Sequence, residues 1–302
     1  MDSSPTLSLL RSRPWRDYEL LDTGDGCKLE RFGSHIFARP EVQAMWSRTL
    51  PAKDWASADA TFQPTNEENG GHWTFRKKEL DRWEMNYVLP GGASLRFWAM
   101  TTSGRHLGVF PEAAPQWDLI AGCLKDARRD SPHILNLFGY TGLATLAAAS
   151  AGARVTHVDA SRKSLNWARE NQVLSGLDKK PVRWIVDDAL KFVEREGRRG
   201  ARYDGIILDP PKFGRGPKGE IWEAYNSLPH LLRSLRAILS NTPLFVILTI
   251  YAIKTSAIHI AEALQEVTRD LHGSIQMGEL VASETSSGRL LSQAVFARWT
   301  ST

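Results

Sequence analysis

This sequence is poor in cysteine and lacks long apolar segments. Its 302 residues include two cysteines, Cys27 and Cys123, which cannot build a disulfide framework or a zinc cluster. No run of about 18 apolar residues is present, so we expect no transmembrane helix. The apolar patch near the N-terminus is too short for a secretory signal. We therefore expect a protein of the reducing cytoplasm, with no membrane association and no bound metal.

The composition allows a well-packed core. Hydrophobic residues make up 42% of the chain and charged residues 24%, as in ordinary globular proteins. The net charge of +4 favours polyanionic partners only mildly, because many enzymes without a nucleic-acid role are equally basic. A chain of this length forms either one large domain or two of ordinary size.

The first third of the sequence is typical of a β domain. Short apolar runs between residues 18 and 110 alternate with clusters of Gly, Pro, Asn and Asp. Within this region we expect a short helix that starts at Pro40 and an irregular, mobile loop over residues 51–71. We divide the chain into a loosely docked arm (1–14), a β-rich domain (15–115) and a second domain (116–302).

Residues 133–159 predict a strand, a glycine turn, a helix and a second strand. The apolar residues before Gly139 suit a buried parallel strand, and Gly139 and Gly142 bracket a turn where the backbone can approach a ligand closely. The second strand ends on Asp159. A carboxylate at this place in a βαβ unit can accept hydrogen bonds from a ribose diol. The stretch therefore predicts a nucleoside-cofactor site.

The dinucleotide fingerprint is missing from this turn. The glycines of NLFGYTG are spaced G-x-x-G, whereas the fingerprint is G-x-G-x-x-G. The turn contains no Lys or Arg to meet a diphosphate, and the nearest later basic side chain is Arg154. This favours a zwitterionic, phosphate-free nucleoside and makes a dehydrogenase the least favoured function.

The alternation of strands and helices continues to the end of the sequence. We expect strands at 182–186, 203–208 and 244–251, each followed by a helix, and then two strands near 275–282 and 293–299 with no helix between them. This pattern predicts an α/β fold with a doubly wound, Rossmann-like sheet that contains an antiparallel strand. Ligands of such sheets bind at the carboxyl ends of the strands.

Residues 132–300 resemble the class I S-adenosylmethionine (SAM) methyltransferases. The turn NLFGYTG resembles the first motif of that family, Asp159 resembles its ribose-binding acid, and Asp188 the acid that hydrogen-bonds the adenine amine. The segment GVFPEAAPQW resembles a stretch that folds over the cofactor, although a structural hinge is an equal alternative. Asp188 is also open to interpretation as a solvated turn residue. The resemblance implies SAM as the cofactor, with contacts from Phe110, Glu112, Asn136, Phe138, Gly139, Tyr140, Thr141, Gly142, Asp159, Ala160, Ser161, Asp188, Ala189 and Asp209.

The motif DPPKF at residues 209–213 follows the fourth predicted strand. Its prolines fix φ and remove N–H donors, which leaves carbonyl groups free to face a substrate. An Asp carboxylate and a proline carbonyl can accept the hydrogens of an amine and keep its lone pair aimed at a methyl group. We predict catalytic, positioning roles for Asp209, Pro210 and Lys212 and substrate contacts from Pro211, Phe213 and Arg215.

DPPKF and the β-rich domain narrow the resemblance to the bacterial 23S ribosomal RNA methyltransferases that act on cytosine C5 or guanine N7. Those enzymes usually begin with a PUA-type RNA-binding domain, and the residues before Tyr18 are too few for one. The cytosine-C5 members need a cysteine after the fifth strand, because C5 is nucleophilic only once a thiolate has added at C6. The corresponding segment here, LTIYAIKTS, has none. The missing cysteine leaves direct, in-line methyl transfer to nitrogen or oxygen, and by the resemblance we expect a nitrogen of an RNA base, with rRNA as the RNA.

Other functions stay open at this stage. Basic residues near the predicted cleft, such as Arg215 and Lys218, suit phosphate contacts, but a solvated basic surface explains them equally well. A methyltransferase that acts on a protein side chain or a small molecule is the first alternative. A SAM-binding protein without catalysis is the second. The sequence does not determine the oligomeric state.

Overall fold

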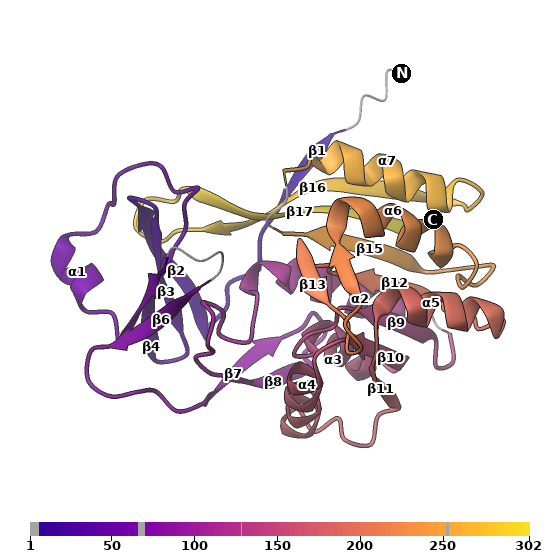
Figure 1. Cartoon of the computed structure of the whole chain (residues 1–302), viewed down its shortest axis with the longest axis horizontal. Helices are drawn as coiled ribbons and strands as arrows, with labels where there is room; N and C mark the ends of the chain where they lie inside the picture. The colour runs from indigo at the N-terminus through magenta and orange to yellow at the C-terminus, as the bar shows by residue number, and fades with distance from the viewer. Residues whose placement is uncertain (1–5, 66–69, 128, 252–253) are drawn as a thin grey trace.

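A computed structural model describes residues 6–65, 70–127, 129–251 and 254–302. A β-rich part formed by the N-terminal strands lies beside a large sheet that is flanked by helices (Figure 1). The two C-terminal strands extend from this large sheet toward the β-rich part (Figure 1).

The large sheet has eight strands in the order β1-β16-β17-β15-β12-β9-β10-β11. All neighbours are parallel except that β17 runs against both β15 and β16. Every residue of the central strands β12 and β15 is buried, as expected for parallel strands that are covered on both faces. The strands are β1 (Leu7–Leu10), β9 (His133–Leu137), β10 (Arg154–Asp159), β11 (Val182–Val186), β12 (Gly205–Leu208), β15 (Phe245–Ile250), β16 (Gly273–Ser283) and β17 (Leu290–Ser301).

Helices cover both faces of this sheet. Successive residues of a strand point to opposite faces, and Ile207 and Leu208 accordingly belong to two different hydrophobic clusters. The first cluster contains side chains of α2 (Ala114–Asp126) and α3 (Leu143–Ser150), and α4 (Arg162–Leu174) packs against β8. The second contains side chains of α5 (Ala189–Arg198), α6 (Ala224–Leu235) and α7 (Ala257–Thr268). The predicted doubly wound α/β fold with an antiparallel strand is confirmed.

The β-rich part shares its core with the helical part. Trp15 packs against Tyr87 with ring centroids 4.9 Å apart, and Tyr87 packs against Trp117 of α2 at 5.4 Å. The two parts therefore share one continuous core. The domain boundary at residue 115 remains a proposal. This part consists of β2 (Tyr18–Gly24), β3 (Cys27–Phe32), β4 (His35–Pro40), α1 (Ala52–Ala56), β5 (Ala60–Pro64) and β6 (Gly71–Phe75), followed by the hairpin of β7 (Trp83–Val88) and β8 (Ser94–Ala99).

Three local expectations for the N-terminal region were wrong. Residues 7–10 are not a loosely docked arm but the edge strand β1, which pairs with β16. No helix starts at Pro40, because the backbone of residues 41–46 bonds to the β2–β3 turn through Glu41, Ala44 and Trp46. The region 51–71 is not irregular, since it contains α1 and β5. Residues 66–69 lie outside the described part of the chain.

The segment after DPPKF contains a hairpin before the helix that was expected to follow the strand at 203–208. Residues 213–223 form a two-stranded hairpin of β13 (Phe213–Arg215) and β14 (Ile221–Glu223), and α6 begins after it. Trp222 lies in β14 and is buried, while Phe213 and Ile221 on the other face of the hairpin are exposed. In the described part of the chain, no helix combines the length and the apolar character needed to cross a bilayer.

The pairing of β1 with β16 depends on a close backbone approach that can be tested. A Cβ atom at Gly278 would collide with the backbone carbonyl of Ser8. We expect Gly278→Ala to displace β1, to accelerate amide hydrogen exchange of residues 7–10, and to lower the free energy of unfolding by about 1–3 kcal/mol. Gly122→Ala in α2 is the control, because no atom lies within 4 Å of its added Cβ. Unchanged exchange of residues 7–10 in Gly278→Ala would contradict this account.

Candidate active site

The turn between β9 and α3 has an unusual backbone. Phe138 and Tyr140 have φ values of 58° and 48°, in the left-handed region that residues other than glycine rarely adopt. Gly142, with φ at 88°, caps the N-terminus of α3. Asp159 Oδ2 accepts a hydrogen bond from the Tyr140 backbone N–H at 2.8 Å, which holds the turn in this shape. Such strain persists only where surrounding contacts enforce it, and it is common at functional sites.

The Asp159 carboxylate accepts backbone hydrogen bonds from two loops, the 138–142 turn and the segment before α4. Its Oδ1 accepts a hydrogen bond from the Ser161 backbone N–H at 2.7 Å, and the Ser161 hydroxyl oxygen in turn accepts from Ser164 N at the start of α4. Ser161 is thereby the N-cap of α4. Burial raises the pKa of Asp159, although both backbone hydrogen bonds act in the opposite direction. Each carboxylate oxygen can still accept a second hydrogen bond.

Buried side chains of β9, α3 and β10 form a row of hydrogen bonds next to the turn. Asn136 Nδ2 donates to Thr145 Oγ1 at 2.9 Å, and Thr145 Oγ1 lies 2.9 Å from His157 Nδ1. Burial lowers the pKa of His157 to about 3, so the ring is neutral at physiological pH. A Cβ on Gly139 would collide with this ring, which explains the glycine.

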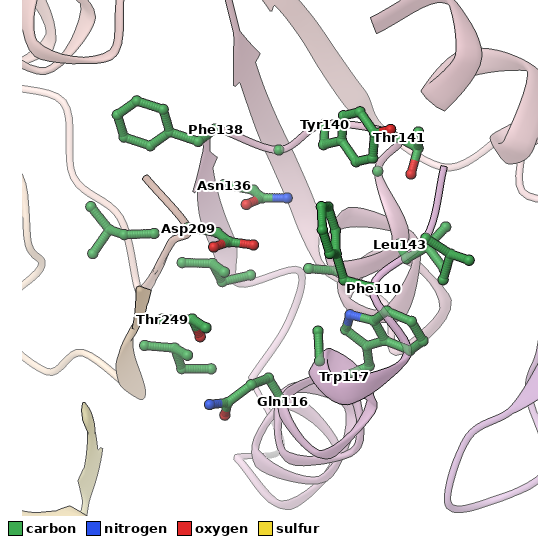
Figure 2. A pocket seen from close by; sticks show the side chains of 18 residues that line it. Phe110, Gln116, Trp117, Asn136, Phe138, Tyr140, Thr141, Leu143, Asp209 and Thr249 are labelled. Carbon is green, nitrogen blue, oxygen red and sulfur yellow. The ribbon is translucent and has the colours of Figure 1, made fainter. Parts of the chain in front are cut away.

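The turn borders a cavity. Figure 2 shows Asn136, Asp209 and Thr249 on one side of it and Phe110, Trp117 and Leu143 on the other. None of its described lining residues is Lys, Arg or His, which agrees with the prediction of a ligand without a diphosphate. The lining residues are Val109, Phe110, Ala113, Gln116, Trp117, Asn136, Phe138, Gly139, Tyr140, Thr141, Gly142, Leu143, Ala144, Ile207, Leu208, Asp209, Ile247 and Thr249.

Asp209 brings an unsatisfied carboxylate oxygen to this cavity. Its Oδ1 atom is buried and has no hydrogen-bond partner among the described residues. Burial and the neighbouring Glu112 raise the pKa of Asp209 well above its usual range. An unpaired buried acceptor costs about 1–3 kcal/mol, so this oxygen is available to a donor that enters the cavity.

The rest of DPPKF is held by the β13–β14 hairpin. Trp222 Nε1 donates to the Pro211 carbonyl at 2.8 Å, and the indole ring packs on Phe138 with centroids 4.7 Å apart. The Ala224 N–H donates to the Lys212 carbonyl at 3.0 Å. The expectation that the carbonyls of the motif face a substrate is therefore wrong for Pro211 and Lys212. Pro210 is buried.

The segment before α2 closes one side of the cavity. Thr141 Oγ1 donates to the Gly108 carbonyl at 2.7 Å and ties this segment to the turn. The Phe110 ring lies 5.6 Å from the Tyr140 ring. Glu112, in a short 3₁₀ helix (Pro111–Ala113), is buried, and burial raises its pKa. It is not a lining residue, but its charge acts on Asp209.

The remaining predicted residues lie along the same edge of the sheet but outside the cavity lining. Asp188 caps α5 by accepting a hydrogen bond from Lys191 N at 2.9 Å, and Ala189 is the first residue of that helix. Lys212, Phe213 and Arg215 are exposed. The predicted residues outside the lining are Glu112, Asp159, Ala160, Ser161, Asp188, Ala189, Pro210, Pro211, Lys212, Phe213 and Arg215.

Several residues at the site were not predicted from the sequence. Gln116 and Trp117 enter from α2 and Thr249 from β15. Gln116 and Trp117 end the segment GVFPEAAPQW, which was expected near the cofactor, but only Phe110 and Glu112 of that segment were named; nothing in the sequence context of Thr249 separates it from ordinary core positions. Tyr251 directly follows β15, and its ring lies 5.3 Å from Phe110. Its position at the carboxyl end of a parallel strand was the available signal.

Comparison with known proteins places this fold and site in one class. A profile of the S-adenosylmethionine-dependent methyltransferases matches residues 123–278, slightly more than half of the chain. A SAM-dependent methyltransferase from Agrobacterium tumefaciens matches with a TM-score of 0.91 and 42% identity, over 100% of this chain and 98% of that one. The chain therefore belongs to the SAM-dependent methyltransferases, and its cofactor is SAM. SMU.776, solved in complex with SAH, shares the fold at a TM-score of 0.71 and 18% identity, over 94% of this chain and 75% of that one.

Curated relatives match a shorter stretch. Ribosomal RNA large subunit methyltransferase K/L of Cellvibrio japonicus is 40% identical over 114 residues, which are 37% of this chain and 14% of that protein. Ribosomal RNA large subunit methyltransferase I of Klebsiella pneumoniae is 41% identical over 81 residues, which are 26% of this chain and 20% of that protein. The chain thus spans at most a fifth of these relatives.

The site fits SAM in its chemistry. The backbone of the turn borders the cavity at residues 138–142, and Asp159 at the tip of β10 has acceptor capacity for a diol. The cavity offers aromatic and apolar surface together with the unsatisfied Asp209 oxygen, and no cation among its described lining residues. In the described part of the chain, no group of three or more His, Cys, Asp or Glu is arranged to hold a metal ion.

The neutral state of His157 predicts a specific pH dependence of stability. Below pH 6.5 the unfolded chain takes up a proton on this imidazole that the folded protein does not bind until about pH 3, so acid shifts the equilibrium toward unfolding. We expect His157→Gln to make the loss of unfolding free energy between pH 6.5 and 4.5 shallower, by up to about 1.4 kcal/mol per pH unit. Denaturant titrations at several pH values measure this. His72→Gln, an exposed residue of β6, should keep the wild-type slope, and equal slopes for all three proteins would refute the assignment.

Proposed function

We propose that this enzyme transfers a methyl group from SAM to a nitrogen of an RNA base, with rRNA as the substrate. The observation that carries the proposal is the buried Asp209 Oδ1 atom, which has no hydrogen-bond partner among the described residues and borders the cavity. An amine N–H is the natural donor for such an oxygen. The bound SAM supplies an electrophilic methyl group on its sulfonium.

The protein binds and orients both reactants. The 138–142 turn and Asp159 hold the nucleoside, with Asp159 accepting from the ribose hydroxyls and Asp188 from the adenine amine. Phe110 covers the cofactor from the side of α2. These assignments rest on the strand-end positions of the two acids and on the second acceptor site of each carboxylate oxygen.

Asp209 and the Pro210 carbonyl orient the target nitrogen. Accepted hydrogen bonds from the amine fix its lone pair on the line to the methyl group, which supplies proximity and orientation in place of a strong base. The carboxylate also stabilises the positive charge that develops on the nitrogen, S-adenosylhomocysteine would be the leaving group, and the methylated amine would then release one proton to solvent. Lys212, Pro211, Phe213 and Arg215 extend this site along the β13–β14 hairpin.

RNA is supported by the names of the curated relatives and by the chemistry of the hairpin. Phe213 is 59% exposed beside Asp209 and offers a ring on which a base can stack. Arg215 and Lys218 on the same hairpin are exposed and positively charged, which suits phosphate contacts. Covalent attack on cytosine C5 is disfavoured, because both cysteines, Cys27 and Cys123, lie far in sequence from the end of β15.

The role of Asp159 in cofactor binding can be measured directly. We expect Asp159→Asn to raise the Kd for SAM about 10- to 100-fold, because the amide offers one acceptor fewer and places an N–H against a backbone donor. Isothermal titration calorimetry measures the change, and thermal unfolding shows whether the variant is folded. Asp178→Asn, an exposed turn residue, should bind SAM as the wild type does. An unchanged Kd for Asp159→Asn would remove Asp159 from the cofactor site.

The substrate class is tested by transfer of labelled methyl from SAM to fractions of cells that lack this gene. We expect label in RNA, concentrated in one rRNA species, and nucleoside analysis should find it on a base nitrogen. Label in protein or in small molecules would replace the proposed substrate. Asp209→Ala should lower kcat/KM about 10²- to 10³-fold, with a change of less than tenfold in SAM affinity. Full turnover by Asp209→Ala with the same substrate would disprove its positioning role.

A further inference from the structure

Tyr251 has a buried hydroxyl group that the fold leaves without a partner. The residue directly follows β15, and the phenol oxygen is buried with no hydrogen-bond partner among the described residues. Buried tyrosine hydroxyls usually find a partner, because an unpaired polar group in the interior is costly. The Tyr251 ring is held against Phe110, a lining residue of the cavity, at 5.3 Å between centroids. The hydroxyl is thus positioned by packing and left unsatisfied.

Tyr251 and Asp209 lie at the ends of neighbouring strands. In the β12–β15 pair Leu208 lies opposite Leu248, so Asp209 and Tyr251 both extend from the same carboxyl edge. Burial raises the pKa of Tyr251 well above its usual range, and the negative charges of Asp209 and Glu112 raise it further. The phenol therefore keeps its proton at neutral pH and offers a donor. Asp209 Oδ1 offers the complementary acceptor, also without a partner among the described residues.

We propose that Tyr251 is a second substrate-positioning residue, whose hydroxyl donates a hydrogen bond to an acceptor next to the amine that Asp209 holds. This inference rests on the proposed function and narrows it. A donor and an acceptor at the carboxyl ends of two neighbouring strands match an exocyclic amine beside a ring nitrogen, as on adenine and cytosine. The guanine edge around N7 presents two acceptors, N7 and O6, and would leave the Asp209 carboxylate unpaired. The site thus selects an amino-bearing base over guanine N7.

Tyr251→Phe is the decisive variant, because it removes the hydroxyl and keeps the ring against Phe110. We expect kcat/KM for the RNA acceptor to fall about 10- to 100-fold, because the substrate acceptor is then left unpaired in a site built to bond it. The Kd for SAM and the melting temperature should stay unchanged, because no hydrogen bond to a described residue is lost. A purely structural hydroxyl would give the opposite pattern, a lower melting temperature at unchanged kcat/KM.

Tyr203→Phe is the matched control. Tyr203 is also buried, but its hydroxyl donates to Glu196 Oε2 at 2.8 Å, beside the first residues of β12 and away from the carboxyl edge. This variant should lose thermal stability and keep its kcat/KM at a temperature where it is folded. Equal effects of the two substitutions on kcat/KM would overturn the proposal.

A second measurement does not depend on RNA turnover. Ligand-observed NMR measures the binding of three probes to the enzyme in the presence of S-adenosylhomocysteine. The probes are adenine, cytosine and unsubstituted purine. We expect adenine or cytosine to bind at millimolar concentration, purine to bind about tenfold more weakly, and Tyr251→Phe to weaken the amino-bearing bases about tenfold. If the wild type labels RNA but Tyr251→Phe is unaffected in both assays, this inference fails and the proposed function stands. If the wild type labels no RNA, the proposed function fails. The binding assay then tests Tyr251 alone: weaker base binding by Tyr251→Phe supports its positioning role, and unchanged binding overturns it.

Discussion

The hydrogen bond from the Tyr140 N–H to the Asp159 carboxylate is the contact on which the site depends. It stabilises a turn in which two non-glycine residues adopt left-handed backbone conformations, each of which costs about 1–3 kcal/mol. Within this turn the Phe138 ring packs against the Trp222 ring, and Trp222 Nε1 donates a hydrogen bond to the Pro211 carbonyl. One strand-end carboxylate thus connects the backbone of the turn to the DPPKF motif. A change at Asp159 is transmitted to both.

The β-rich part contributes to the electrostatics of the same site. Glu30 and Arg39 form a buried ion pair at 2.6 Å, and Arg39 with Lys28 holds the pKa of Glu30 below its usual range although burial acts in the opposite direction. The charges of Lys28, Glu30 and Arg39 act on Glu112, and Glu112 acts on Asp209. Buried ion pairs are weak evidence for stability but fix geometry well. The β-rich part therefore takes part in setting the field around Asp209.

The sequence predicted those elements whose signals are local. Strand periodicity, the spacing of Gly139 and Gly142 and the acid at the end of β10 sufficed for the fold and for much of the cavity lining. Residues 7–10 were missed, because their pairing partner β16 lies more than 250 residues further along the chain and four residues carry too little periodicity. The Pro40 helix failed because pairing with the β2–β3 turn outweighs the preference of proline for a helix start. The β13–β14 hairpin was missed because its glycines and prolines resemble those of an open loop.

The residue that follows β15 limits the chemistry of this site. Cytosine-C5 chemistry requires a thiolate nucleophile, and Tyr251, directly after β15, carries a phenol. Burial and two neighbouring carboxylates keep that phenol protonated, so it cannot serve as a nucleophile at neutral pH, but it can donate a hydrogen bond. Asp209 provides an acceptor in its buried Oδ1 atom, which has no hydrogen-bond partner among the described residues. A wrong substrate leaves the Tyr251 hydroxyl or the Asp209 oxygen unpaired. Since an unpaired polar group is costly to bury, the same burial discriminates against that substrate.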